Sequence, residues 1–353
     1  MRKKSLAFLK SILKSPSPSG YEQPVQKLWR EYVKQFADVR TDFHGSAIGG
    51  INPKGSPRIM FAGHCDEIGF MVRYIDDKGF ISFGPIGGFD ESIIPGRRVT
   101  VHTADGPVPG VIGKTPIHLM KPDDRKKASE IRDLWIDIGA KDKKAAKKLV
   151  AVGDPVTYVE DFMEMKTGLA VARAFDDRIG SFAVAEVLRL LSEGKKKLTS
   201  AVFGVSTVQE EIGLRGARTS AFGVDPQIGI ATDVTFATDQ PGVEKKQVGD
   251  IRLGGGPVIA RGPNINPKVH DLLVATAKKM KIPFQVEGIS RATGTDANAI
   301  QVTRSGVAAG LLSIPVRYMH TPVETLDLTD AENAAKLMAG FAEAVTPDMD
   351  FTP

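Results

Sequence analysis

The sequence has only one cysteine, Cys65, among 353 residues. A single thiol excludes an internal disulfide framework and is typical of proteins in a reducing compartment. No run approaches the roughly 20 apolar residues that a membrane-spanning helix needs. The basic first fifteen residues also lack the unbroken apolar core of a signal peptide, because their apolar residues recur at helical spacing among lysines. We therefore expect a cytoplasmic protein with no membrane partner.

A strong excess of charge of one sign is absent as well. The chain has 47 basic and 42 acidic residues, which gives a net charge of +5. Much of the basic excess lies between Lys121 and Lys148, where it fits a solvated helix face without interleaved aromatic side chains. A nucleic-acid interface needs a stronger and more clustered excess. We expect no nucleic-acid partner.

The most informative segment of the chain is an apolar run at residues 201–208 that ends in acidic residues. Its β-branched side chains, with little polar alternation, predict a central parallel strand covered on both faces. Glu210 and Glu211 follow it, before Gly213 and Gly216. In open α/β sheets, ligands bind at the carboxyl ends of such strands. Taken alone, the two acids could equally begin a solvated loop or a helix.

A second apolar strand is expected within residues 58–69, and it ends in the metal-compatible side chains of His64-Cys65-Asp66. On an extended chain His64 and Asp66 point the same way, so that one could bind a metal while the other orients it. Cys65 then faces the opposite side and is expected to be a small core residue. A lone histidine after a strand is more often structural than metal-binding, so this segment does not decide between the two interpretations.

Three further segments place chemistry-bearing residues at element ends. Asp176 and Asp177 precede a helix expected at residues 181–191, where one aspartate could serve as an N-cap. Asp233 lies near the end of an apolar strand at residues 227–234. His320 follows another buried strand, at residues 307–317.

Four histidines remain, and three of them, His44, His102 and His118, lie away from any acidic cluster in the sequence. We interpret His44, His102 and His118 as structural or surface residues. His270 is expected on the exposed first turn of an amphipathic helix at residues 268–281.

The pattern of the chain predicts an α/β protein with a mostly parallel central sheet flanked by helices. Residues 70–163 differ, since short alternating β segments separated by polar turns predict a compact β domain. Because the α/β pattern resumes afterwards, we expect residues 1–69 and 164–353 to form one catalytic domain around this insertion.

Together, these strand ends offer two imidazoles, several carboxylates and no thiolate. This donor set is typical of a catalytic site for zinc or a neighbouring divalent ion. If one acid bridges, each of two ions receives a histidine, a terminal carboxylate and the shared carboxylate, with room left for water.

These segments carry a family resemblance that covers essentially the whole chain. GHCDEIGFMV, ARAFDDRIG, TVQEEIGLRGA, IATDVT, GTDANAIQ and PVRYMHTPVE appear in family order. The sequence resembles the TET-type (tetrahedral) dinuclear metal aminopeptidases, a family whose members also carry the names glutamyl aminopeptidase and endoglucanase.

The resemblance implies a role for each candidate residue. One metal would be held by His64 and Asp233, the other by Glu211 and His320, and Asp176 would bridge them. Glu210 would be the general base and Asp66 would orient His64. Asp177 departs from the family pattern, in which many members have asparagine.

The resemblance also implies partners and cofactors. It predicts two divalent metal ions per subunit, with zinc favoured over cobalt or manganese, and short peptides as substrates. The inserted segment would be a PDZ-like β-barrel, and dimers would assemble into a tetrahedral dodecamer. Three other functions remain open at this point: a related dinuclear deacylase or carboxypeptidase, a glycosidase, and a catalytically inactive assembly protein. The preferred first residue of the substrate and the physiological metal are also left open.

Overall fold

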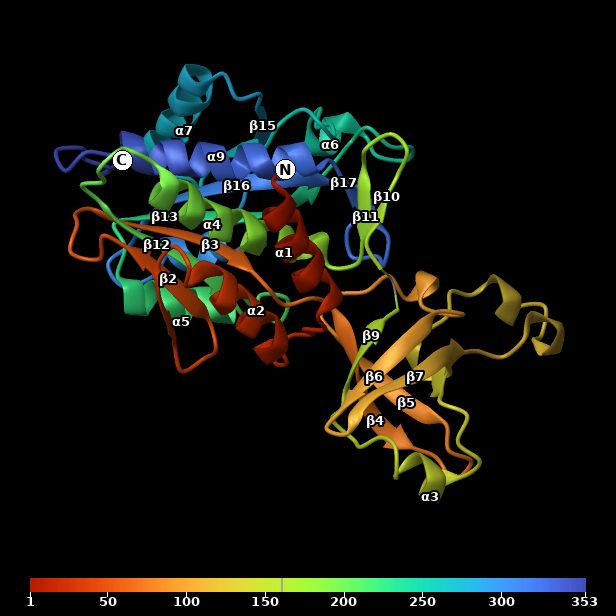
Figure 1. The fold of residues 1–353 in the computed structure, drawn as a ribbon. Helices are drawn as coiled ribbons and strands as arrows, with labels where there is room; N and C mark the ends of the chain where they lie inside the picture. The colour runs from red at the N-terminus through yellow and green to blue at the C-terminus, as the bar shows by residue number, and fades with distance from the viewer. Residues whose placement is uncertain (160) are drawn as a thin grey trace.

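A mixed eight-stranded sheet forms the centre of the computed structural model, which describes residues 1–159 and 161–353. The four central strands are parallel, whereas most edge pairs are antiparallel. The prediction of an α/β fold is therefore confirmed, with parallel pairing concentrated in the middle of the sheet (Figure 1). In spatial order the strands are β1 (Asp38–Thr41), β2 (Ala47–Ile51), β12 (Ala201–Thr207), β3 (Arg58–His64), β13 (Ile228–Phe236), β16 (Ala308–Val316), β14 (Val258–Arg261) and β15 (Gln285–Gly288).

Helices cover both faces of this sheet, which explains why its central strands are apolar throughout. One face packs against α1 (Lys3–Lys14), α2 (Gln23–Val33), α4 (Phe175–Glu193), α7 (Pro267–Met280) and α9 (Leu328–Ala344). The other face packs against α5 (Arg215–Val224) and α8 (Asp296–Gln301). The short helix α6 (Lys245–Val248) precedes β14. Cys65, which directly follows β3, is buried in the first of these cores, as expected.

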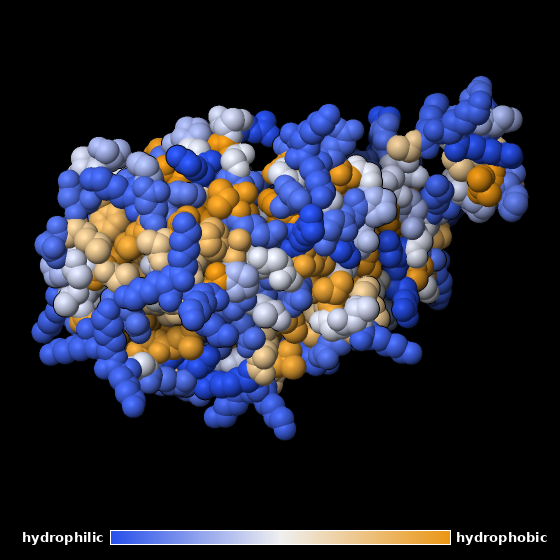
Figure 2. Space-filling model, turned by 90° about the horizontal axis from the view of Figure 1, so that it is seen from above, coloured by the Kyte–Doolittle hydropathy of each residue, from blue (hydrophilic) through white to orange (hydrophobic). Residues whose placement is uncertain are grey.

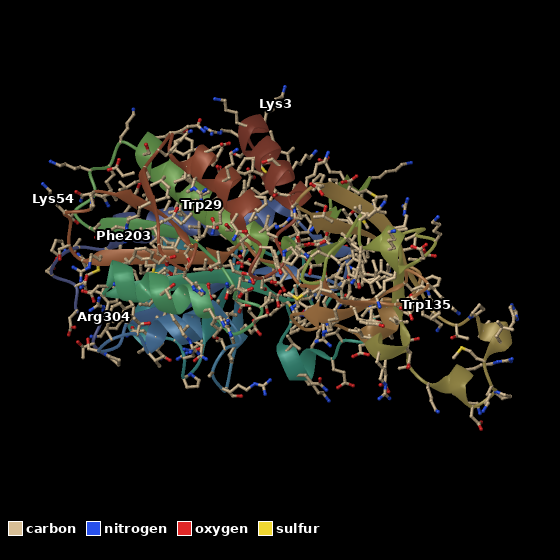
Figure 3. All side chains as sticks on the ribbon, turned by 90° about the horizontal axis from the view of Figure 1, so that it is seen from below. Lys3, Trp29, Lys54, Trp135, Phe203 and Arg304 are labelled. Carbon is tan, nitrogen blue, oxygen red and sulfur yellow. The ribbon has the colours of Figure 1, made fainter. Side chains whose placement is uncertain are left out.

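The interior and surface of this part of the molecule differ sharply in chemistry. The indole of Trp29 is fully buried and donates a hydrogen bond to the carbonyl of Ser181 at 3.0 Å, whereas Lys3 and Lys54 point outward (Figure 3). Seen from above, hydrophilic side chains cover most of the surface between scattered apolar patches (Figure 2). None of the helices in the described ranges combines the length and hydropathy of a membrane span.

Six strands close into a separate barrel in the middle of the chain (Figure 1). Its core contains Phe70, Val99, Ile136 and Val156. The segment also contains a short helix, α3 (Lys143–Ala146). Around the barrel the strands are β4 (Gly69–Ile75), β5 (Ile81–Ile86), β8 (Trp135–Asp137), β7 (Gly106–Gly113), β6 (Arg98–Thr103) and β9 (Pro155–Tyr158), with the 3-10 turns η1 (Glu91–Ile93), η2 (Ile117–Leu119), η3 (Asp124–Lys126) and η4 (Ile131–Asp133) between them.

A small antiparallel sheet brings two distant segments together beside the main sheet. It consists of β10 (Met163–Glu164), β11 (Ala170–Ala172) and β17 (Glu324–Leu326). The register pairs Ala172 with Glu324. The segment that precedes α4 therefore lies beside the segment that follows β16.

Two expectations about local structure need correction. The helix expected at 181–191 is assigned from Phe175, although Asp176 and Asp177 have non-helical backbone angles, so that its regular part begins after them. His270 was expected to be exposed, but it is buried, and its Nδ1 lies 3.0 Å from the carbonyl oxygen of Ala260. It is buried because α7 packs its first turn against β14.

Candidate metal centre

The strand register places the first candidate residues side by side. Thr207, the last residue of β12, pairs with His64, the last residue of β3, so that Glu210 follows at the same edge. On the other side, β13 pairs with β3 as far as Ala231 and Ala62. Two residues further on, Asp233 reaches the level of His64. Parallel strands that end together thus create the crevice in which open α/β sheets bind ligands.

The carboxylate of Asp176 lies between the two candidate histidines. Its Oδ1 is 3.2 Å from Nε2 of His64, and its Oδ2 is 3.2 Å from Nε2 of His320. One carboxylate with each oxygen facing a different imidazole has the arrangement expected of a bridging ligand.

The other three carboxylates of the cluster each lie near one of the two imidazoles. Asp233 Oδ1 lies 4.0 Å and Glu210 Oε2 3.8 Å from Nε2 of His64. Glu211 Oε2 lies 3.7 Å from Nε2 of His320. All six predicted residues of the cluster therefore converge, although these distances alone do not separate Glu210 from the metal ligands. Two groups that could hold an ion emerge, His64 with Glu210 and Asp233, and His64 with Asp176 and Glu211.

Both imidazoles present Nε2 to the cluster, because Nδ1 is engaged elsewhere. Nδ1 of His64 lies 3.2 Å from the backbone oxygen of Asp66 and 3.4 Å from its Oδ1. Nδ1 of His320 lies 3.0 Å from the carbonyl oxygen of Gly88, in the loop after β5. An imidazole that donates from Nδ1 to an oxygen keeps the lone pair of Nε2 free for a metal.

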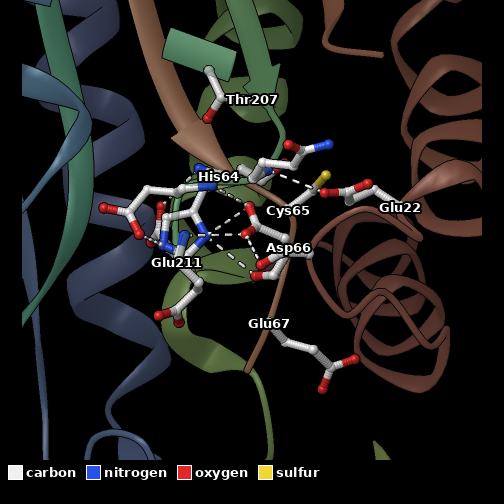
Figure 4. Close-up of polar contacts among 12 residues, drawn as sticks. Glu22, His64, Cys65, Asp66, Glu67, Thr207 and Glu211 are labelled. Carbon is white, nitrogen blue, oxygen red and sulfur yellow. Dashed lines mark hydrogen bonds and ion pairs between the residues drawn. The ribbon is translucent and has the colours of Figure 1, made fainter. Parts of the chain in front are cut away.

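Asp66 does more than the orienting role that the resemblance implies. Besides facing His64, its oxygens accept hydrogen bonds from the backbone N–H of Glu210 at 3.1 Å and of Glu211 at 3.2 Å. The hydroxyl of Ser19 donates a further bond to Asp66 at 2.7 Å. The fully buried Asp66 carboxylate thus fixes both the imidazole and the loop that carries the two glutamates (Figure 4).

Glu324 was not singled out by the sequence reasoning, although it lies in one of the quoted family segments. Its buried carboxylate accepts hydrogen bonds from the backbone N–H of Asp176 and of His320, each at 3.0 Å. It therefore ties the bridging residue to the second histidine. The only signal in the sequence was an acid four residues after a candidate ligand.

Two other aspartates support the site from outside the cluster. Asp177 accepts hydrogen bonds from the backbone N–H of His64 at 3.1 Å and of Gly180 at 3.0 Å, so it both caps the regular part of α4 and holds the end of β3. Asp296 accepts a hydrogen bond from the Thr207 hydroxyl at 2.6 Å. Asp296 lies at the start of α8 and has no assigned role in the sequence analysis.

The crowding of charge changes how these groups bind protons. Burial, with Asp176 or other neighbouring carboxylates adding to it, raises the pKa of Glu210, Glu211 and Asp233. Burial would also raise the pKa of Asp176, but the imidazoles of His320 and His64 hold it well below its usual range. Burial lowers the pKa of His320, but the facing carboxylates raise it by more, so that its pKa lies above the usual value.

A cation fits this cluster on charge and on donor type. Among the ion pairs of residues 1–159 and 161–353, none joins a lysine or arginine to Asp176, Glu210, Glu211 or Asp233. Buried carboxylates are normally paired or bound to a metal, since an isolated buried charge is costly. Nitrogen and carboxylate oxygen donors suit zinc and its neighbours.

The residues of the cluster line a cleft of about 640 Å³. This volume suits a small molecule or the end of a peptide. Beyond the cluster the cleft is lined by Gly88, Gly213, Leu214, Val234, Thr235, Phe236, Glu287, Ile289, Arg291, Ala292, Thr293, Gly294, Thr295, Asn298, Leu311, Ser313 and Met319.

Comparisons with known proteins agree with this architecture. A sequence profile described as M42 glutamyl aminopeptidase matches residues 45–337. The lysyl aminopeptidase of Pyrococcus furiosus is 40% identical over 351 residues, which cover 98% of this chain and 99% of that protein.

Solved structures are similar over almost the full chain. A TET aminopeptidase from a marine sediment archaeon of the Thaumarchaeota superimposes with a TM-score of 0.92 and 36% identity, covering 97% of this chain and 96% of that one. The TET1 peptidase of Pyrococcus horikoshii, described as able to assemble into a tetrahedron or a large octahedral shell, gives a TM-score of 0.87 and 33% identity, with 97% and 100% coverage.

Proposed function

Because this chain belongs to the M42 glutamyl aminopeptidase family, we propose that it removes amino-terminal residues from short peptides with two divalent ions bound around Asp176. The observation that carries the proposal is the Asp176 carboxylate, with one oxygen 3.2 Å from each imidazole. His64 and Asp233 would hold one ion, Glu211 and His320 would hold the other, and Asp176 would serve both. Zinc is the first candidate because histidine with carboxylate is typical of its catalytic sites; the same donors also suit cobalt and manganese.

When bound, the paired ions supply Lewis acidity toward the peptide carbonyl and lower the pKa of an attacking water. The chain supplies the proton transfers. Glu210 accepts a proton from the attacking water at its carboxylate and delivers it to the nitrogen of the departing amine. Asp66 keeps Glu210 in place by accepting a hydrogen bond from its backbone N–H.

Glu210 is assigned as the base because the family resemblance implies this role and because Glu211, its neighbour, faces His320. The carboxylate of Glu210 lies at the wall of the cleft, 3.8 Å from Nε2 of His64.

The proposed function is tested with peptides that differ only at the amino end. A free amino-terminal peptide is expected to lose its first residue, an amino-blocked copy to resist, and a chelator to abolish turnover until divalent metal is returned. Cleavage of the blocked peptide would favour a deacylase, and removal of the last residue would favour a carboxypeptidase. Turnover of a β-glucan that survives chelation would favour a glycosidase, and no turnover under any metal would favour an inactive assembly protein.

We also propose an assembly of the kind described for the TET1 peptidase of Pyrococcus horikoshii. Residues 1–69 and 164–353 form the catalytic domain, and residues 70–163 form a PDZ-like insertion through which dimers associate into a cytoplasmic tetrahedral dodecamer. Similarity to the TET1 peptidase supports this proposal. Light scattering on the purified protein should give twelve times the mass of one chain, and a chain-sized particle at micromolar concentration would contradict it.

A further inference from the structure

One acidic side chain lines the cleft without belonging to the metal cluster. Of the acids that line it in the described part of the chain, only Glu287 has no contact with His64 or His320. It lies on β15, near the edge of the main sheet. Its Oε2 accepts a hydrogen bond from the hydroxyl of Thr235 at 2.8 Å.

The position of Thr235 fixes where this carboxylate lies relative to the metal cluster. Asp233 and Thr235 are alternate residues of β13, so their side chains point to the same face of the sheet. Two residues of strand span about 7 Å. The Glu287 carboxylate therefore meets β13 at Thr235, about 7 Å along the strand from Asp233, within the same cleft.

The charge of Glu287 has no cationic partner among the ion pairs of the described residues. It is half-buried, and burial raises its pKa while the Thr235 hydroxyl lowers it. Thr235 occupies one carboxylate oxygen, which leaves acceptor capacity on the group. A half-buried acid of this kind gains from a cation that enters the cleft.

The surrounding wall suits the stem of a long cationic side chain. Ile289, Phe236 and Met319 line the same cleft with apolar surface. Lysine carries its ammonium on a flexible four-carbon stem that can pack against such surface while the charge reaches an acid.

Arg291 also lines the cleft and would favour the opposite charge. However, its side chain is exposed to solvent, whereas Glu287 is half-buried. Interactions of exposed charges are weakened by the high dielectric constant and by salt. The carboxylate therefore has the stronger influence on a side chain within the cleft.

We propose that Glu287 selects substrates whose first residue has a cationic side chain, lysine or arginine, by pairing with that charge. This inference rests on the proposed aminopeptidase function and adds the substrate class to it.

The test compares two chromogenic substrates that differ only in the charged group. Norleucine has the four-carbon stem of lysine without its ammonium. The lysyl p-nitroanilide is expected to exceed the norleucyl p-nitroanilide in kcat/KM by about tenfold or more, as is typical of a hydrogen bond to a charged group. Glu287→Gln should lower this lysyl-to-norleucyl ratio about 10- to 100-fold. The control Arg291→Gln should leave the ratio unchanged or raise it.

The outcomes separate this inference from the function on which it rests. A wild-type preference for glutamyl or norleucyl substrates, or an unchanged ratio in Glu287→Gln, overturns the selection while leaving the aminopeptidase intact. An equal loss on both substrates in Glu287→Gln also overturns it, because the carboxylate would then serve the α-amine shared by both. No cleavage of any aminoacyl substrate by the metal-loaded wild type contradicts the proposed function itself. Because the ratio is measured within one variant, partial misfolding does not mimic the expected result.

Discussion

The two halves of the candidate centre are built in different ways. The side chain of His64 is only 2% exposed and ends a buried strand, whereas that of His320 is 37% exposed and lies in a loop beyond β16. His64 is oriented by Asp66, two residues away, and His320 by the carbonyl of Gly88 in the loop after β5. One half depends on strand register, and the other depends on contacts between segments far apart in the chain.

The backbone shows the same difference. Tyr318 and His320 both have positive φ angles, of 62° and 59°. Non-glycine residues in this region carry a conformational cost, which the surrounding structure must offset. Hydrogen bonds from the N–H groups of His320 and Asp176 to Glu324 provide that support. We therefore expect the His64 half to bind its ion more tightly and the His320 half to depend more on its anchors.

The largest effect is expected where the proposed general base is removed, since both halves serve the same reaction. Glu210→Gln keeps the size of the side chain but cannot accept a proton. We expect kcat to fall by up to about 10⁴-fold, while metal content stays at the wild-type value. Activity is measured on an aminoacyl p-nitroanilide and metal by elemental analysis. Loss of one ion in this variant would instead make Glu210 a ligand of the His64 half.

The next effect concerns the anchor of the buried half. Asp66→Asn replaces one carboxylate oxygen by an amide N–H₂, which then faces the backbone N–H of either Glu210 or Glu211, because these two donors bond to different oxygens of Asp66. We expect kcat/KM to fall about 100-fold, the upper range for residues that support metal ligands. Ser19→Ala, which removes only the hydroxyl donor to Asp66, should have a much smaller effect. Equal effects of the two variants would mean that Asp66 acts mainly through Ser19.

A smaller effect is expected from the anchor of the exposed half. Glu324→Gln leaves one carbonyl oxygen to serve the N–H groups of both Asp176 and His320. We expect about a tenfold loss of affinity for one of the two ions, measured by competition with a chromogenic chelator. Asp327→Asn, at the N-cap of α9, is the control and should retain the wild-type affinity. Weakening of both ions together would show that the halves are not independent.

The smallest effect is a pH dependence of the metal-free protein. Burial raises the pKa of Glu211 and Asp233 to about 8, whereas unfolded carboxyls titrate near about 4. The folded state therefore binds more protons between these values, and the stability of metal-free protein should fall as pH rises from about 5 to 8. Thermal unfolding measured with and without metal checks this, because metal should displace the protons and flatten the slope. A metal-free protein that gains stability over this range would contradict it.

The sequence predicted the buried half more completely than the exposed half. The apolar runs that end at His64 and before Glu210 mark parallel strands, and strand ends at one edge must lie together. Helix α4 was placed less accurately, since the break after Asp177 depends on tertiary contacts. Burial of His270 was missed because the helical pattern does not show which strand covers a first turn.

The anchors of the exposed half could not be found from local patterns. Gly88 contributes only a backbone carbonyl, and no side chain at that position carries a signal. Glu324 lies beside Asp176 because β17 pairs with β11, a contact between segments about 150 residues apart in the chain. Local propensity contains no information about such a pairing. Only the family resemblance included this segment, and it gave Glu324 no role.

The central claim is that Asp176 bridges two ions, one in each half. Anomalous diffraction from crystals of the zinc-loaded protein tests it most directly. We predict two peaks about 3.5–4 Å apart, one beside His64 and Asp233, the other beside His320 and Glu211, with one Asp176 oxygen toward each. A single peak, or peaks away from Asp176, would contradict it.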